Sequence, residues 1–204
     1  MKKLAIDGGD RVVPEGALKP WPPIEDRDRQ AVLRVFDNQI VCTLEKEVIC
    51  VDSVADALKK EFTAAGATTG RMVGTGQSCI ASKRFIVVES AAEEFSALFA
   101  AKMGALKVGD PLDESTQVGA IVNESALEEL LDQLKQSVDL GARVLCGGER
   151  LPGDGCFLAP TVVTDTTPEM RVVKEEVFGP IAPIIVVKDE AEAIRVANDS
   201  EFGL

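Results

Sequence analysis

The chain of 204 residues contains no histidine and no tyrosine. Without histidine it cannot form a Ser-His-Asp or Cys-His catalytic group of its own, nor a helical zinc motif that needs two histidines. Any general base must therefore be a carboxylate, a lysine or a group supplied from elsewhere. Aromatic residues make up only 4% of the chain, so any core must be built mainly from valine, isoleucine, leucine and alanine.

Long apolar runs and positive charge are also scarce. No apolar run reaches the roughly 18 residues that a membrane helix needs, and the basic start at residues 1–4 lacks the apolar segment of a signal peptide. The formal net charge of −12 repels nucleic acids and anionic membrane surfaces. The five cysteines are odd in number and lack zinc-site spacing. These features predict a cytoplasmic protein without nucleic-acid, membrane or metal partners.

The pattern of the sequence changes along the chain. Residues 1–39 contain four prolines, which keep a backbone extended, and end in a stretch of helical spacing over 25–37, so an extended arm and a helix are expected. Residues 40–69 form a transitional segment. From residue 70 onward, apolar stretches typical of strands alternate with helical segments. This alternation predicts an α/β domain over 70–204 with a mostly parallel sheet.

Individual elements follow from the same patterns. Ser90 and Ser125 each precede a glutamate by three residues, which is a capping-box signature for a helix start. Gly141 is expected to end the second of these helices. A last helix is expected over 190–198. Strands are expected at 84–88, 143–146, 161–163 and 181–187, the last of them interrupted by Pro183.

Two segments carry candidate chemistry. Cys79 ends a glycine-rich run at 74–79, just before a strand, where backbone amides can approach a bound carbonyl and a thiolate can attack it. The alternative for Cys79 is a small, buried core residue. The second segment, 174–180, has two adjacent glutamates before an aromatic residue, a glycine and a proline, which suggests a rigid turn that presents an acid. The alternative there is a solvated acidic patch.

The segment at 76–87, GQSCIASKRFIV, closely resembles the nucleophile segment of aldehyde dehydrogenases. The resemblance runs from about residue 70 to residue 204, and it implies a partial catalytic domain of that family. Around Cys79 and at the end of the chain, the sequence most resembles succinate-semialdehyde dehydrogenases. Further segments resemble the family in the family's order, at 106–111 with 118–119, 141–143 with 147–148, 159–162, 175–180 and 198–204.

The resemblance implies a reaction and the residues for it. The family oxidises an aldehyde, here including a semialdehyde, to a carboxylic acid with NAD or NADP. Cys79 would attack the aldehyde as a thiolate, and its own N–H would contribute to the oxyanion hole. Glu176 would hold a ribose of the nicotinamide nucleotide, with Phe178 packed near the ring. Glu45 stands about where the family has its water-activating glutamate, although the glycines of the family's Glu-Leu-Gly-Gly motif are absent here. Arg84 is expected to be structural.

Three alternatives remain open from the sequence. The family's dinucleotide-binding domain has no counterpart in the sequence, so the chain is expected to be a catalytic-domain fragment. It is then either an aldehyde dehydrogenase fragment or an inactive interaction module, and self-association is expected. Residues 1–39 resemble the N-terminus of a sugar-type aminotransferase that uses pyridoxal phosphate, which suggests a join of two gene fragments and an aminotransferase-related protein as the third alternative.

Overall fold

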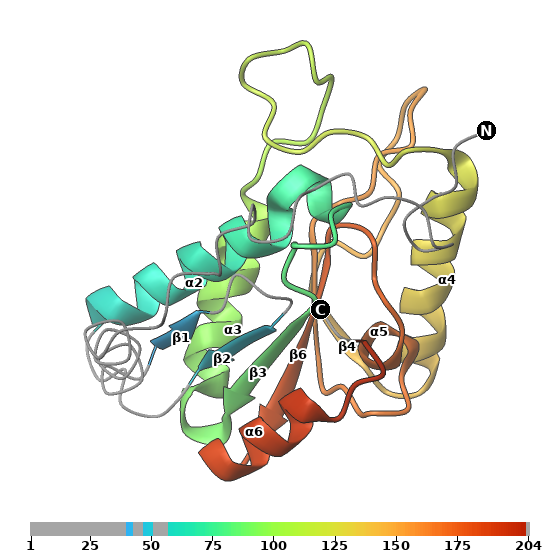
Figure 1. Ribbon diagram of the computed structural model, residues 1–204. Helices are drawn as coiled ribbons and strands as arrows, with labels where there is room; N and C mark the ends of the chain where they lie inside the picture. Colours follow the sequence, from blue (N-terminus) through green and yellow to red (C-terminus); the bar gives the residue numbers. More distant parts are fainter. Residues whose placement is uncertain (1–39, 43–46, 51–56, 203–204) are drawn as a thin grey trace, which may run out of the picture. The chain divides into compact units, whose positions relative to one another are not determined.

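The computed structural model describes residues 40–42, 47–50 and 57–202 (Figure 1). The chain divides into two compact units, 1–37 and 38–204, and all of the described residues belong to the second unit. The predicted arm and helix of residues 1–39, and Glu45, lie outside the described residues.

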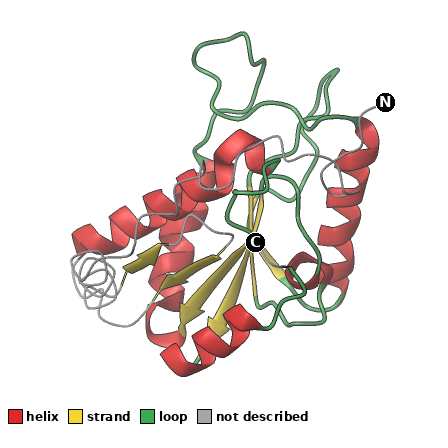
Figure 2. Cartoon of the chain, viewed as in Figure 1, coloured by secondary structure: helices red, strands yellow, loops and turns green. Residues whose placement is uncertain are grey.

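A mixed sheet of six strands forms the centre of the second unit (Figure 2). The three inner pairings, β2–β3, β3–β6 and β6–β5, are parallel, whereas the pairings at the two edges, β1–β2 and β5–β4, are antiparallel. The predicted α/β class is therefore confirmed, with antiparallel edges on a parallel centre. In order across the sheet, the strands are β1 (Ile40–Cys42), β2 (Glu47–Cys50), β3 (Arg84–Val88), β6 (Ile181–Val187), β5 (Thr161–Thr164) and β4 (Arg143–Cys146).

Pro183 lies inside β6, a central strand, without ending it. Proline has no N–H to donate to a neighbouring strand, so it is unusual in this position. Here the partner of β6 changes at the proline. Residues 181–183 of β6 pair with β5, and residues 184–187 pair with β3. The expected interruption is therefore a change of partner within a continuous strand.

Helices cover both faces of the sheet. On one face, α2 (Ala57–Met72) and α3 (Glu89–Gly104) pack on an apolar cluster that includes Phe85, Phe95 and Phe99. The Phe85 and Phe99 rings are 4.7 Å apart between centroids, and those of Phe95 and Phe99 are 5.3 Å apart. On the other face lie α4 (Glu124–Asp139), α5 (Arg171–Lys174) and α6 (Glu190–Asn198). In Figure 1, α3 passes behind the sheet and α6 in front of it. No described helix is both long and apolar enough to cross a membrane.

The predicted capping boxes were wrong for both helix starts. Helix α3 begins directly after β3, so Val88 takes the N-cap position and Ser90 already lies inside the helix. Helix α4 is capped two residues earlier than expected, by Asn123, whose side chain accepts a hydrogen bond of 2.8 Å from the Ala126 N–H. An asparagine cap satisfies one of the free N–H groups of the first turn, as the predicted Ser125 would have done.

The end of α4 matches the prediction. Gly141 has a φ of +109°, a conformation that favours glycine. Its N–H donates to the Val138 carbonyl at 2.9 Å, and the Ala142 N–H donates to the Ser137 carbonyl at 3.0 Å. This pair of bonds is a Schellman motif, which satisfies two carbonyls of the last turn.

Candidate active site

The two candidate segments meet at one edge of the sheet. Cys79 lies in the connection from α2 to β3, and the 175–180 loop leads into β6. Because β3 and β6 are adjacent and parallel, both loops lie at the amino ends of their strands. The sheet therefore brings together two segments that are about 100 positions apart in the sequence.

The two loops touch through their backbones at Gly76 and Gly179. A Cβ atom on Gly76 would lie 2.2 Å from the Gly179 carbonyl oxygen, far inside van der Waals contact. Gly76 also has a φ of +74°, and the preceding Gly74 and Thr75 have φ values of +57° and +62°. Only glycine fits at Gly76, for both conformation and space. The glycine-rich run thus allows two segments of the main chain to approach each other closely.

Arg71, at the end of α2, holds this contact from inside. Its side chain is fully buried. The guanidinium donates to the carbonyls of Ser82 at 2.6 Å, Gly76 at 3.0 Å and Val177 at 2.9 Å, and also to that of Gly179. Burial lowers the pKa of Arg71 to about 9, and the charge of Glu176 opposes this shift. One cation therefore joins the loop before β3 to the loop before β6.

Cys79 itself is exposed on the turn that these contacts hold. The backbone of the turn is fixed on both sides of it, because the Gln77 N–H donates to the Gly74 carbonyl at 3.0 Å and the Ala81 N–H to the Ser78 carbonyl at 3.1 Å. Among the described residues, no backbone carbonyl accepts a hydrogen bond from the Cys79 N–H. The thiol is thus accessible, and the buried-core alternative for Cys79 was wrong.

Gln77 ties the same turn to a third segment, residues 119–122. Its side-chain amide donates to the Ala120 carbonyl at 3.1 Å, and its side-chain oxygen accepts from the Val122 N–H at 2.8 Å. Nearby, the Thr75 hydroxyl accepts from the Gly119 N–H at 3.2 Å. These contacts fix the Cys79 turn to the segment of residues 119–122.

Lys83 connects the Cys79 turn with the two predicted cofactor residues. Its ammonium donates to the Ser78 carbonyl at 2.6 Å, lies 3.9 Å from a carboxylate oxygen of Glu176 and lies 4.9 Å from the centre of the Phe178 ring. The Lys83 side chain is only 7% exposed, whereas that of Glu176 is 34% exposed and Phe178 is 41% exposed. The structure thus places Cys79, Glu176 and Phe178 on one site.

The adjacent glutamates point to different partners. Glu175 accepts hydrogen bonds from Arg171 at 2.7 and 2.8 Å and from Gln133 at 3.1 Å, which docks α5 on α4. The hydrogen bond from Arg171 is the main reason that the pKa of Glu175 is below its ordinary value. Only Glu176 turns to the Lys83 side. The acidic pair is therefore one carboxylate that docks α5 on α4 and one that lies beside Lys83.

Comparison with known proteins identifies the family. The model of the aldehyde dehydrogenase family matches residues 37–204. The chain belongs to the aldehyde dehydrogenase family. The match begins upstream of residue 70, and it includes the strands β1 and β2.

Two similar aldehyde dehydrogenases are named as succinate-semialdehyde dehydrogenases. That of Deinococcus radiodurans, named for NADP(+), is 44% identical over 151 residues, which are 74% of this chain and 32% of that protein. That of Escherichia coli K12, named for NAD(P)+, is 44% identical over 144 residues, which are 71% of this chain and 31% of that protein. The chain spans about a third of the length of these relatives.

Solved aldehyde dehydrogenase structures have the same fold. Lactaldehyde dehydrogenase from Escherichia coli matches with a TM-score of 0.73 and 30% identity, over 78% of this chain and 33% of that chain. A 3,6-anhydro-L-galactose dehydrogenase in complex with NAP matches with a TM-score of 0.72 and 35% identity, over 87% of this chain and 38% of that chain. The fold class is therefore that of a partial aldehyde dehydrogenase domain.

A nicotinamide nucleotide, the cofactor that the family implies, fits part of this aldehyde dehydrogenase site. Phe178 is exposed although Val177 and Gly179 on either side are buried, so an aromatic face is available to a flat ring. Glu176 offers a half-exposed carboxylate to a ribose hydroxyl. Within the described part of the chain, these two residues fit the nicotinamide end of the cofactor.

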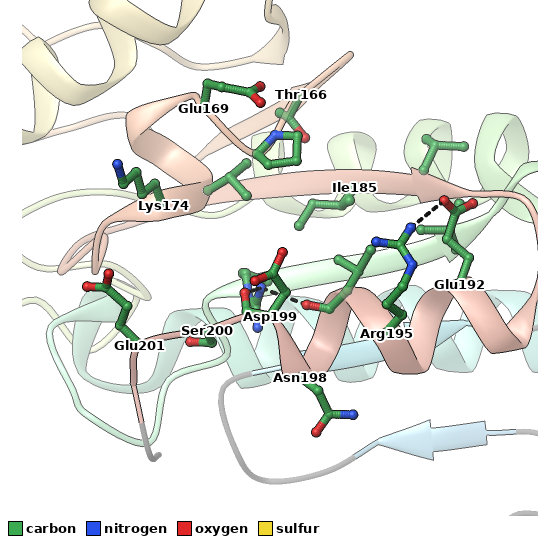
Figure 3. Close-up of a pocket in the computed structure, with 16 residues that line it drawn as sticks. Thr166, Glu169, Lys174, Ile185, Glu192, Arg195, Asn198, Asp199, Ser200 and Glu201 are labelled. Atoms are coloured by element: carbon green, nitrogen blue, oxygen red, sulfur yellow. Dashed lines mark hydrogen bonds and ion pairs between the residues drawn. The ribbon is translucent and has the colours of Figure 1, made fainter.

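A separate pocket of this aldehyde dehydrogenase chain lies against α6 (Figure 3). It has a volume of about 610 Å³, and its lining includes Thr166, Ile185 and Arg195 but none of the site residues. Arg84 borders it and donates to the carbonyls of Val196 at 3.1 Å and of two neighbouring residues at the end of α6. Arg84 is structural, as the sequence suggested, since it satisfies a helix C-terminus.

Sequence reasoning missed Arg71 and Lys83, the two buried cations of the site. Lys83 carried a weak signal, since it stands directly before a buried strand that begins at Arg84. Arg71 carried none, because its carbonyl partners at Val177 and Gly179 come from a distant part of the chain. Neither residue is recognisable without knowing which loops meet.

Proposed function

We propose that this chain carries the nucleophile and part of the nicotinamide site for the oxidation of an aldehyde to a carboxylic acid with NAD or NADP. The observation that carries the proposal is the position of Cys79. It is exposed on a turn whose backbone is fixed by Arg71 and Lys83 against the loop of Glu176 and Phe178. An exposed thiol, the Cys79 N–H without a backbone partner among the described residues, and an exposed aromatic ring thus support the proposal.

The proposed chemistry begins at the Cys79 sulfur. The thiolate attacks the aldehyde carbon and forms a C–S bond, while the π pair of the C=O bond moves onto the oxygen, which carries the negative charge of the tetrahedral thiohemiacetal. The Cys79 N–H donates to that oxygen and stabilises the charge. When bound, NAD(P)+ supplies the hydride acceptor that turns the adduct into a thioester. Glu176 holds the ribose and Phe178 flanks the ring. Glu45 is proposed as the base that activates water for thioester hydrolysis.

The names of the relatives suggest the first substrate to test. Both named above act on succinate semialdehyde, a short chain with an aldehyde at one end and a carboxylate at the other. We therefore propose a semialdehyde as the substrate class for a protein that contains this chain.

The experiment measures protection of Cys79 from alkylation. The purified chain is treated with iodoacetamide in the presence of succinate semialdehyde, and Cys79 is followed by peptide mass spectrometry. We expect saturable protection that dilution reverses, because the thiohemiacetal forms without the cofactor. Succinate, which has no aldehyde, is the matched control and should not protect. Absence of protection, or equal protection by succinate, would contradict the proposal. NAD(P)H formation, and its loss in Cys79→Ser, then tests turnover.

A non-catalytic interaction module is the second candidate. It is favoured by exposed apolar side chains away from the Cys79 turn, such as Leu140, which is 62% exposed, and Ile194, which is 51% exposed. Saturable protection of Cys79 would decide against it.

The proposed aminotransferase origin of residues 1–39 stays a prediction, since that segment lies outside the described residues. The domain boundaries at residues 39 and 69 stay predictions too.

A further inference from the structure

The peptide unit between Ser78 and Cys79 has an unusual environment. Its carbonyl oxygen accepts two hydrogen bonds, one from the Lys83 ammonium at 2.6 Å and one from the Ala81 N–H at 3.1 Å. The N–H at the other end of the same peptide belongs to Cys79, the proposed nucleophile. No cis peptide bond occurs among the described residues, so this carbonyl and this N–H point in opposite directions.

The position of the Lys83 charge makes it effective. The side chain is 7% exposed, so little water screens its field. The ammonium lies 3.9 Å from the Glu176 carboxylate, which is well beyond the 2.6 Å to the Ser78 oxygen. Of these two contacts the short bond to the carbonyl is therefore the stronger, and it is charge-assisted. A cation at a carbonyl draws electron density through the peptide and makes the N–H at the far end a stronger donor.

We propose that Lys83 is a positioning residue that orients and polarises the Ser78–Cys79 peptide, so that the Cys79 N–H stabilises an oxyanion more strongly. This inference rests on the proposed function, since it requires that Cys79 attacks a carbonyl group. It assigns to Lys83 an effect on the oxygen of the adduct rather than on the sulfur of the thiolate. It therefore predicts that Lys83 matters for attack on carbonyl carbon and little for attack on saturated carbon.

Two electrophiles separate these effects. With p-nitrophenyl acetate, the Cys79 sulfur forms a C–S bond to the ester carbon, and the π pair of the C=O bond moves onto the oxygen to give an oxyanion. The C=O bond then forms again, p-nitrophenolate leaves, and a thioester remains on Cys79. With iodoacetamide, the same sulfur displaces iodide from a saturated carbon, and no oxyanion forms. The ratio of the two rates at Cys79 therefore reports oxyanion stabilisation, whereas the iodoacetamide rate alone reports the thiolate and its access.

The experiment compares these rates at Cys79 in the full chain and its variants by peptide mass spectrometry, with Cys79→Ser as the background. Lys83→Met keeps the apolar stem, and Lys83→Gln keeps an N–H donor without the charge. Loss of a whole oxyanion donor costs about 100- to 1000-fold in rate, so we expect the ester rate to fall about tenfold in either variant. Iodoacetamide rates should stay within about twofold. Lys83→Arg, which restores a cation, should recover part of the loss.

A matched control removes a lysine elsewhere. Lys135 on α4 is 72% exposed and pairs with Asp139 at 2.6 Å, so Lys135→Gln removes the same kind of charge away from the Cys79 turn. Both rates should be unchanged in this variant. Equal loss of both rates in Lys83→Gln, or loss of neither, would overturn the role of Lys83. If Cys79 of the unsubstituted chain reacts with iodoacetamide but not with the ester, the proposed function is wrong, and the proposed role of Lys83 is wrong with it.

Discussion

At the scale of single residues, the three cysteines with described side chains differ in surroundings. Cys79 is exposed, whereas Cys146 and Cys156 are partly buried. Burial raises the pKa of the Cys146 thiol. Burial, followed by the neighbouring Glu124 carboxylate, raises that of Cys156. A thiol with a raised pKa holds less thiolate at neutral pH and reacts more slowly.

We therefore expect iodoacetamide at pH 7 to modify Cys79 before Cys146 and Cys156. The measurement is peptide mass spectrometry at low reagent excess, with a denatured sample as the control in which the three thiols should react alike. Labelling of Cys146 or Cys156 first, in the folded chain, would contradict a prepared site at Cys79.

Gly76 offers the sharpest test of the contact between the two loops. Gly76→Ala forces a left-handed conformation on alanine and drives a methyl group into the Gly179 carbonyl, so the free energy of unfolding should fall by about 3 kcal/mol or more. Gly66, in α2, is the matched control because a Cβ there meets nothing within 4 Å. Gly66→Ala should stabilise the chain by about 0.5–1 kcal/mol. Urea melts measure both changes, and similar effects of the two substitutions would refute this account.

At the scale of elements, α5 is a single turn in which one arginine forms ion pairs with three carboxylates. Arg171 pairs with Glu129, Asp132 and Glu175 at 2.5 to 2.7 Å, and its side chain is 22% exposed. The hydrogen bonds to Glu175 and Glu129 raise the pKa of Arg171, and the hydrogen bond from Arg171 lowers the pKa of Glu175. The docking of α5 fixes the start of the loop that carries Glu176.

This cluster predicts acid sensitivity. The pKa of Glu175 is depressed in the folded chain, so its stabilising effect is complete above about pH 4.5, the ordinary value, and is lost as the pH falls through the lower folded value. Partly exposed pairs of this kind contribute only about 0.2–1 kcal/mol each. Urea melts between pH 6 and pH 3.5 should show a steeper loss of stability in the unmodified chain than in Arg171→Met. The same pH dependence in both would contradict the prediction.

The sequence predicted elements better than it predicted their ends and contacts. The bounds of β3, β6 and α6 follow from a continuous apolar run or a helical period within each segment. The cap of α3 does not follow from the local sequence, because β3 runs directly into the helix and Val88 therefore takes the cap position. Cys79 was singled out by its glycine-rich segment together with the resemblance of that segment to the family. Arg71 binds the Val177 carbonyl 106 positions away, and no local pattern records such a contact.

At the scale of the whole molecule, apolar exposure and charge act in opposite directions. Leu112 is 90% exposed and Val122 is 77% exposed, and Val186 is 41% exposed although it lies on the central strand β6. Such side chains favour association. The net charge of −12 opposes it by repulsion between copies, which salt screens.

We therefore expect the purified chain to self-associate, and to do so more as salt is raised from 50 to 500 mM. Sedimentation velocity at both salt concentrations measures this. The substitution Leu112→Gln should reduce the association and leave the urea midpoint unchanged, since the side chain is almost fully exposed. A monomer at both salt concentrations would refute the prediction.

Affinity for the cofactor is also a property of the whole molecule, because many contacts together must supply the binding energy. The described residues offer a nicotinamide nucleotide the carboxylate of Glu176 and the ring of Phe178. A hydrogen bond to a charged group contributes about 1.5–3 kcal/mol, whereas micromolar binding needs about 8.2 kcal/mol. We expect the chain of residues 1–204 to bind NAD+ more weakly than micromolar in calorimetry. Micromolar binding would show that other residues of the chain complete the site.

The bonds of Arg71 end on main-chain carbonyls rather than on side chains. Every amino acid has a carbonyl, so these bonds themselves require no particular side chain, although the close approach of the two loops still requires glycine at Gly76. Ile80, 65% exposed next to Cys79, can therefore be exchanged while the thiol keeps its place. A library randomised at this position should yield mostly folded proteins that differ in which aldehydes they admit. The geometry of attack and the choice of substrate are thus separately adjustable, which suits a scaffold that is to be redirected to new aldehydes.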